Sequence, residues 1–304
     1  MTATMHRTGN LLDLSALSKT TIAFCGLGSL GSITASLLSY PWKKIILIDP
    51  EKLEDSNVER HLLGYSSVGE YKVDAMKKWF LDRRLVPSQN IIALHDISRT
   101  FEVLAEADIL VVSIDDPQAC YGINQFAVTH NIPAVYGGVY PMGSGGQTAV
   151  IPNPIHTCYL CAEKKMGALE YKGKPADMDY GVDPMSLISS SGKISAVPSL
   201  KHSISTIAGD MTYATLQILK GMANTEIVVY AQEWENVVYI PNNLRNNVSG
   251  FVSAMAGLGL NQNFAIGLEE GQYVLKLRQG KVSLSLSKWE NCPAHSKSNS
   301  ADDI

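Results

Sequence analysis

Short apolar runs alternate with segments of helical spacing along the chain. Runs that are apolar in consecutive positions predict strands buried on both faces, as in parallel sheets. Such runs occur at residues 20–25, 44–48, 91–94 and 109–113. Apolar residues at helical spacing occur at residues 32–38, 72–84, 119–130 and 203–220. This alternation predicts an α/β fold: a Rossmann-like, mostly parallel sheet with helices on both faces.

The later part of the chain is less regular. Further strands are expected at residues 133–136, 147–151, 226–230, 273–277 and 281–287. The polar stretch at 164–193 predicts a long loop, a feature usually tied to function. We expect one domain over 1–304, with a core at about 17–235, an insertion at about 236–271, C-terminal strands and half of a metal site at about 272–296, and a disordered tail at 297–304.

Composition narrows the classes of function. The 304 residues are 45% hydrophobic and 18% charged, which suits a packed core. The net charge of −4 argues against a nucleic-acid partner. The chain shows neither an apolar run long enough for a bilayer nor the pattern of a signal peptide, so no membrane partner is expected. Five cysteines do not form a disulfide framework, which indicates a reduced, cytoplasmic protein.

A glycine cluster between the first expected strand and helix is the first candidate site. Gly26, Gly28 and Gly31 allow a tight turn and let phosphates approach the N-terminus of a helix. Asp49 ends the next strand, where a carboxylate can accept from ribose hydroxyls. This pattern alone fits an NAD-dependent oxidoreductase as well as an ATP-using enzyme.

Charged residues downstream separate the two readings. Asn57, Arg60 and Lys72 follow Asp49, and Asp115 ends a later strand. A triphosphate needs such cations, and magnesium needs such a carboxylate, because phosphoryl and nucleotidyl transfer depend on positioning and charge neutralisation. A dehydrogenase needs neither.

In this order and spacing, the motifs resemble the ThiF/MoeB/ubiquitin-activating family. The resemblance implies a Rossmann-like enzyme, usually a homodimer, that joins AMP to the C-terminal carboxylate of a ubiquitin-like protein or peptide. It places the three glycines under ATP, Asp49 on the ribose, Asn57, Arg60 and Lys72 on the phosphates, and Asp115 on Mg²⁺, with Arg60, Lys72 and Asp115 catalytic. It also suggests that residues 137–147 line the path of the substrate tail, although a flexible surface loop is an equal alternative. Arg7 is the one candidate for an arginine lent to a partner subunit.

Two short motifs far apart predict a metal site. Cys158 and Cys161 form one C-x-x-C pair, and Cys292 and His295 form a second pair near the end of the chain. Together they offer four ligands suited to a closed, structural Zn²⁺ site. There are two alternatives. The first motif could be a redox pair, and the second motif could lie in an unstructured end of the chain. The family commonly uses four cysteines here, so the histidine is a departure.

The other two cysteines bear on how far the reaction proceeds. Cys25 is expected in the core, and Cys120 is expected to pack, although a position near a nucleotide could instead lower its pKa. The loop at 162–199 has no cysteine. We therefore expect an enzyme that stops at the acyl-adenylate or passes it to an outside acceptor. The alternatives are the NAD-dependent oxidoreductase and a non-catalytic scaffold partner of an activating enzyme.

Overall fold

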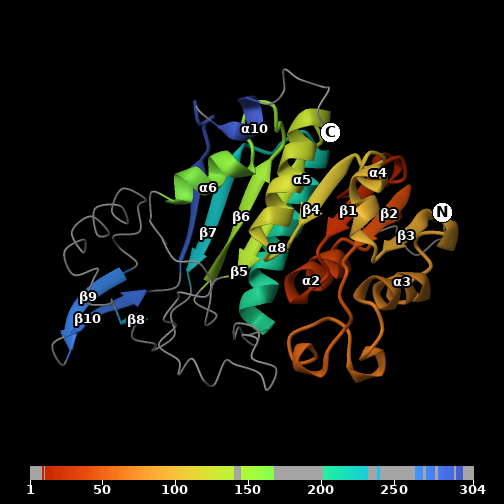
Figure 1. Ribbon diagram of the computed structural model, residues 1–304, viewed down its shortest axis with the longest axis horizontal. Helices are drawn as coiled ribbons and strands as arrows, with labels where there is room; N and C mark the ends of the chain where they lie inside the picture. Colours follow the sequence, from red (N-terminus) through yellow and green to blue (C-terminus); the bar gives the residue numbers. More distant parts are fainter. Residues whose placement is uncertain are drawn as a thin grey trace.

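An eight-stranded sheet forms the centre of the protein, in the order β11-β7-β6-β5-β4-β1-β2-β3 (Figure 1). The computed structural model describes residues 9, 11–139, 145–167, 201–231, 238–239, 264–269, 272–277, 280–290 and 292–296. The strands are β1 (Thr21–Cys25), β2 (Lys44–Ile48), β3 (Ile91–Leu94), β4 (Ile109–Val112), β5 (Ala134–Val139), β6 (Gly145–Ile151), β7 (Glu226–Ala231) and β11 (Gly280–Ser285). Strands β1 to β5 pair in parallel, whereas β6, β7 and β11 each pair antiparallel. The predicted mostly parallel, Rossmann-like sheet is confirmed.

Helices cover both faces of this sheet. They are α1 (Leu14–Leu17), α2 (Ser29–Leu37), α3 (Lys72–Asp82), α4 (Thr100–Leu104), α5 (Pro117–His130), α6 (Tyr159–Gly167), α8 (Lys201–Leu219) and α10 (Pro293–Ser296), with short 3₁₀ turns at η3 (Asp55–Asn57), η4 (Tyr65–Ser67), η5 (Ser88–Asn90) and η6 (Ile97–Arg99). Figure 1 shows α5 crossing one face and α8 the other.

Alternate residues of the central strands build two separate cores. Phe24 on β1 packs in the core that includes side chains of α2, α3 and α8. Its neighbours Ala23 and Cys25 pack in the core that includes α4, α5 and α6. Because every residue of β1 is buried, both faces are apolar, and the strand reads as a continuous apolar run in the sequence.

Helix α6 differs from the sequence prediction. It begins at Tyr159, inside the first cysteine motif, and continues to Gly167, so the start of the predicted loop at 164–193 is helical. The side-chain oxygen of Asn124 on α5 accepts from the backbone N–H of Tyr159 at 2.8 Å, which satisfies a group at the helix start. This stabilisation comes from a neighbouring helix, and the local sequence does not reveal it. Residues 168–200 lie outside the described part.

A second, three-stranded sheet also departs from the predicted boundaries. It contains β8 (Val238–Tyr239), β9 (Phe264–Glu269) and β10 (Gln272–Leu277), in the order β8-β10-β9. Because β10 pairs with both other strands, the expected boundary between an insertion ending at 271 and strands starting at 272 falls inside this sheet. Strand β11 then returns to the main sheet beside β7. Arg7, residues 240–263 and the tail at 297–304 lie outside the described part.

Candidate functional site

The glycine loop joins β1 to α2 at the carboxyl end of the parallel strands. Gly26 has a φ of +87°, and a Cβ there would lie 2.6 Å from the carbonyl oxygen of Ser113. A Cβ on Gly31 would lie 2.0 Å from the carbonyl oxygen of Gly26. Gly28 is different, because a Cβ there would meet nothing within 4 Å and no side chain caps α2, whose N-cap it is. The fold therefore requires Gly26 and Gly31, while Gly28 leaves the start of α2 open to an anion.

Asp49 fixes this loop from the end of β2. Its side chain is 5% exposed, and its carboxylate accepts from the backbone N–H groups of Leu27 at 2.6 Å and Glu51 at 2.9 Å. Burial raises the pKa of Asp49, against the lowering effect of Lys72 and of the two N–H donors. The carboxylate thus orders the glycine loop, and the predicted contact with ribose remains a prediction.

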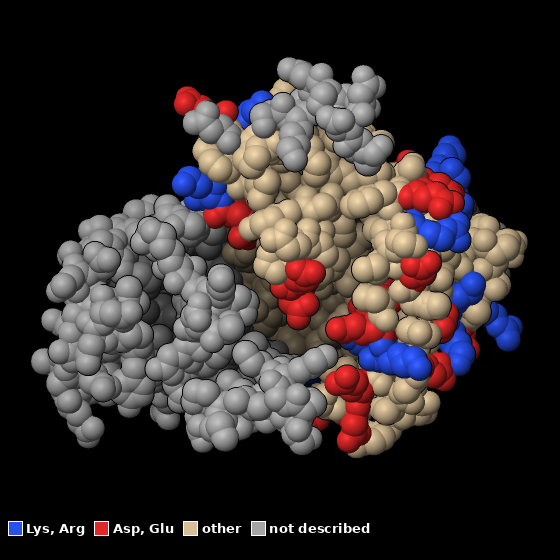
Figure 2. Space-filling model, viewed as in Figure 1, with Lys and Arg blue, Asp and Glu red and all other residues tan. Residues whose placement is uncertain are grey.

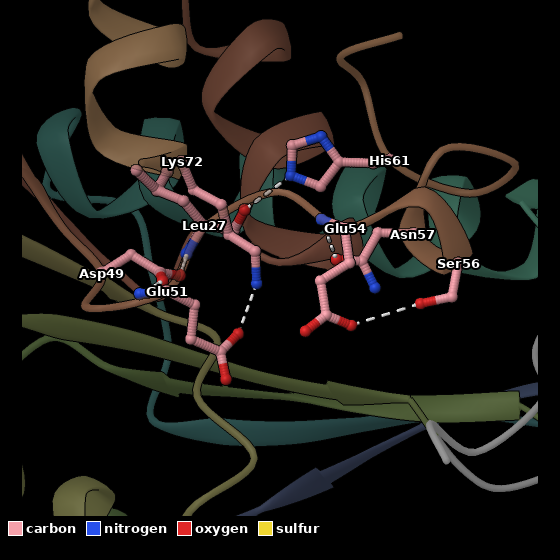
Figure 3. Close-up of polar contacts among 8 residues, drawn as sticks. All are labelled: Leu27, Asp49, Glu51, Glu54, Ser56, Asn57, His61 and Lys72. Atoms are coloured by element: carbon pink, nitrogen blue, oxygen red, sulfur yellow. Dashed lines mark hydrogen bonds and ion pairs between the residues drawn. The ribbon is translucent and has the colours of Figure 1, made fainter. Parts of the chain in front are cut away.

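A short backbone pairing explains the spacing of the second motif. Residues 51–53 run beside 69–72: Leu53 N–H donates to the Glu70 carbonyl at 2.9 Å and Lys72 N–H to the Glu51 carbonyl at 3.0 Å. Gly69, with a φ of +87°, makes the turn that this pairing needs. Lys72 is 4% exposed, and its ammonium pairs with the Glu51 carboxylate (Figure 3). The G-x-x-K motif therefore delivers its lysine next to the strand end that carries Asp49.

His61 connects the glycine loop to the turn that carries Arg60. Its ring is 1% exposed; Nε2 donates to the Leu27 carbonyl at 2.7 Å, and Nδ1 accepts from the Leu63 N–H at 3.0 Å. This pair of bonds defines a neutral ring. Burial, reinforced by nearby cations, lowers the pKa of His61 to about 4. No sequence motif pointed to His61.

Asn57 and Asp115 complete the predicted set. Asn57 ends η3, and its side-chain oxygen accepts from the Glu54 N–H at 3.2 Å. Figure 3 shows its amide nitrogen and the Lys72 ammonium pointing to the same side. Asp115 is exposed just beyond β4, close in sequence to Ser113, whose hydroxyl donates to the Gly26 carbonyl at 3.0 Å. The structure brings the predicted residues to one edge of the sheet, around one glycine loop.

The glycines near the end of β5 have a packing explanation. A Cβ on Gly137 would lie 2.2 Å from the sulfur of Met211, and one on Gly146 would lie 2.7 Å from the side chain of Ile207. Both partners are on α8, so these glycines let that helix lie close to the sheet. Residues 137–139 and 145–147 are strand rather than loop, and 140–144 lie outside the described part. Their predicted contact with a substrate tail stays a prediction.

Charge on the face seen in Figure 2 is mixed. Acidic and basic side chains are interspersed over the half of the molecule that holds α3 and α4, and the surface over α5 carries few cations. The described residues on this face therefore form no continuous basic surface of the kind typical of nucleic-acid binding. Within the described ranges, no helix is both long enough and apolar enough to cross a bilayer.

The four predicted metal ligands meet at the opposite edge of the sheet. Cys158 and Cys161 follow β6, which runs antiparallel to β5, and their sulfurs lie 3.8 Å apart. The Cys292 sulfur lies 3.5 Å from Cys158, and His295 Nδ1 lies 3.9 Å from the Cys161 sulfur. Zinc–sulfur bonds of about 2.3 Å place the corners of a tetrahedron about 3.8 Å apart. The ligand atoms are thus spaced for one tetrahedral ion.

Hydrogen bonds with neighbouring backbone groups orient the ligands of this cluster. His295 Nε2 donates to the Pro154 carbonyl at 2.9 Å, which leaves Nδ1 free of a proton and able to bind a metal. The backbone N–H of Trp289 points to the Cys161 sulfur at 3.4 Å. The second motif lies in and before α10, so the unstructured alternative is wrong. Four convergent side-chain ligands, three of them buried, suit a closed structural site better than a redox pair.

The remaining cysteines lie in the core. Cys25 is fully buried and Cys120 is 5% exposed, with its thiol donating to the Ile114 carbonyl at 3.2 Å. Burial, with nearby carboxylates, raises the pKa of Cys120 to about 12. The thiol is therefore protonated at neutral pH, which favours the expected packing role over a nucleophile.

Comparison with known proteins agrees with the fold and the motifs. Residues 4–251 match the model of the ThiF family. The chain is 30% identical over 119 residues to the adenylyltransferase and sulfurtransferase UBA4 of Meyerozyma guilliermondii, a match that covers 38% of this chain and 27% of that relative. Among solved structures, E. coli MccB with MccA-N7isoASN aligns at 17% identity and a TM-score of 0.59, and E. coli MccB with ATP at 17% and 0.55. These alignments cover 94% of this chain and 69% and 68% of MccB, and they show a shared fold.

Proposed function

Since the chain belongs to the ThiF family, we propose that it is an ATP-dependent adenylyltransferase that joins AMP to the C-terminal carboxylate of a peptide or ubiquitin-like protein. One observation carries this proposal. Asp49 and His61 both bond to the glycine loop, and residues 69–72 pair with residues 51–53, so Lys72 and the turn that carries Arg60 are held beside the open start of α2.

The chemistry suits these groups. A carboxylate oxygen of the substrate attacks the α-phosphorus of ATP; a new P–O bond forms while the bond to the β-phosphate breaks, and pyrophosphate leaves with that electron pair. The attacking carboxylate is already ionised at neutral pH, so the step needs no general base. It needs neutralisation of charge and alignment of the two reactants.

The residues of this chain divide those tasks. Asn57, Arg60 and Lys72 would hold the phosphates, and the neutral ring of His61 keeps the Arg60 turn against the glycine loop. The exposed Asp115 carboxylate offers oxygen ligands of the kind that Mg²⁺ prefers. Magnesium, when bound, would supply further positive charge to the phosphate oxygens.

Zinc has a separate, structural role in this proposal. Cys158, Cys161, Cys292 and His295 would hold Zn²⁺ and tie α10 to α6, far from the glycine loop. A site filled by four protein ligands has no open position for a reactant. We further propose that the protein is a cytoplasmic homodimer. It would use no cysteine of its own as a nucleophile, since Cys120 is a buried thiol.

Calorimetric titration with nucleotides tests the proposal. With magnesium, the protein should bind ATP and not NAD, whereas an oxidoreductase would bind NAD. The Lys72→Met variant should bind ATP at least about tenfold more weakly, the usual effect of losing a charge-assisted hydrogen bond. Lys78→Met is the matched control, because Lys78 lies on the same helix but is exposed and pairs with Glu70 at 2.7 Å. NAD binding without ATP binding would refute the proposal.

A further inference from the structure

A second lysine lies beside the candidate phosphate site, from an element that no motif marked. Lys201 is the first residue of α8, and its ammonium donates to the backbone carbonyl of His61 at 2.9 Å. Helix α8 packs in the same core as α2. Lys201 is therefore held at the turn that carries Arg60, next to the glycine loop.

Three cations lie near enough to His61 to act on its pKa. After burial, the cations that lower its pKa to about 4 are Lys72, Lys201 and Arg60, in that order. They come from α3, from α8 and from the turn before His61, and the His61 ring bonds to the glycine-loop carbonyl of Leu27.

Lys201 and Arg60 raise the positive potential at this turn, where the charge of Lys72 is offset by its pairing with Glu51, and the open N-terminus of α2 raises the potential further. A polyanion relieves both effects. A triphosphate carries more negative charge than a monophosphate and is longer, so it can contact cations on more elements. The arrangement thus favours ATP over AMP.

We propose that Lys201 is a further phosphate-binding residue, which joins Asn57, Arg60 and Lys72 on the triphosphate of ATP and contributes little to the binding of AMP. This inference rests on the proposed function. The Lys201 ammonium has three N–H donors, of which the His61 carbonyl takes one, so two can bond to phosphate oxygens. Its contacts would be lost when pyrophosphate leaves, which favours product release.

Titration of ATP and of AMP into matched variants tests the proposal. Lys201→Met should raise the Kd for ATP about tenfold, as expected for one charge-assisted contact, and change the Kd for AMP less than about twofold. Lys201→Arg keeps the charge and should restore most of the ATP affinity. Lys220→Met, an exposed lysine just beyond the other end of α8, is the control and should bind both nucleotides like the wild type.

Two results would overturn the inference while leaving the proposed function in place. The first is wild-type ATP affinity in Lys201→Met. The second is an equal loss for ATP and AMP, which would mean that Lys201 only supports the His61 turn. A wild-type protein that binds no ATP would instead refute the proposed function itself.

Discussion

The buried histidine gives the protein a defined response to acid. In the folded state the pKa of His61 is lowered to about 4 from an ordinary 6.5, so the folded protein resists taking up the proton. In the unfolded chain, His61 takes up the proton with its ordinary pKa. The stability that depends on a neutral His61 is therefore complete above about pH 6.5, and it is lost as the pH falls from about 6.5 towards 4.

The size of this loss follows from the pKa difference. A difference of about 2.5 units corresponds to about 3 kcal/mol when the group is fully titrated. Between pH 7.5 and pH 5, linkage predicts a loss of about 2 kcal/mol in the free energy of unfolding. The ring is 1% exposed, so solvent does little to screen this effect.

Urea unfolding at a series of pH values would measure it. Other groups titrate in the same range, so the comparison is with His61→Gln, which keeps a donor and an acceptor but takes up no proton. The difference between wild type and variant should shift by about 2 kcal/mol from pH 7.5 to pH 5, with the wild type losing more. A difference that stays constant over this range would refute the assignment of a buried, neutral His61.

Four further substitutions have definite outcomes. Gly31→Ala, whose Cβ would lie 2.0 Å from a backbone oxygen, should lower the Tm by at least about 5 °C, whereas Gly28→Ala should keep the wild-type Tm and weaken ATP binding; equal melting of the two variants would contradict the geometry. Cys292→Ser should reduce the bound zinc found by metal analysis and lower the Tm, and a protein that carries zinc undiminished after this change would rule out Cys292 as a ligand. Cys120→Ser should adenylate its substrate within about twofold of the wild-type rate, since a buried thiol is not the nucleophile; loss of activity in a folded variant would return Cys120 to the mechanism.

Local patterns in the sequence were enough for much of the fold. Strands β1, β2 and β4 are apolar on both faces, so each appears as a continuous run. The glycine loop is equally visible, because Gly26 and Gly31 have backbone positions that exclude a side chain. The metal cluster could also be predicted from local sequence, because its four ligands lie in two short motifs.

Other features depend on contacts between distant residues. Helix α6 is stabilised at its start by Asn124 of another helix. His61 and Lys201 meet only because α8 packs beside α2, and no spacing in the chain encodes this approach. The pairing of Glu51 with Lys72 likewise results from the way residues 51–53 and 69–72 fold together.

The most direct test of adenylation is intact-mass analysis of synthetic peptides incubated with the protein, ATP and magnesium. Peptides of varied C-terminal sequence would be compared with the same peptides carrying a C-terminal amide, and Lys72→Met would serve as the inactive control. The account predicts an AMP adduct on a carboxylate peptide with the wild-type protein, and none on amidated peptides or with the variant. An adduct on amidated peptides, or a product bound to the protein and released by a thiol reductant, would contradict it.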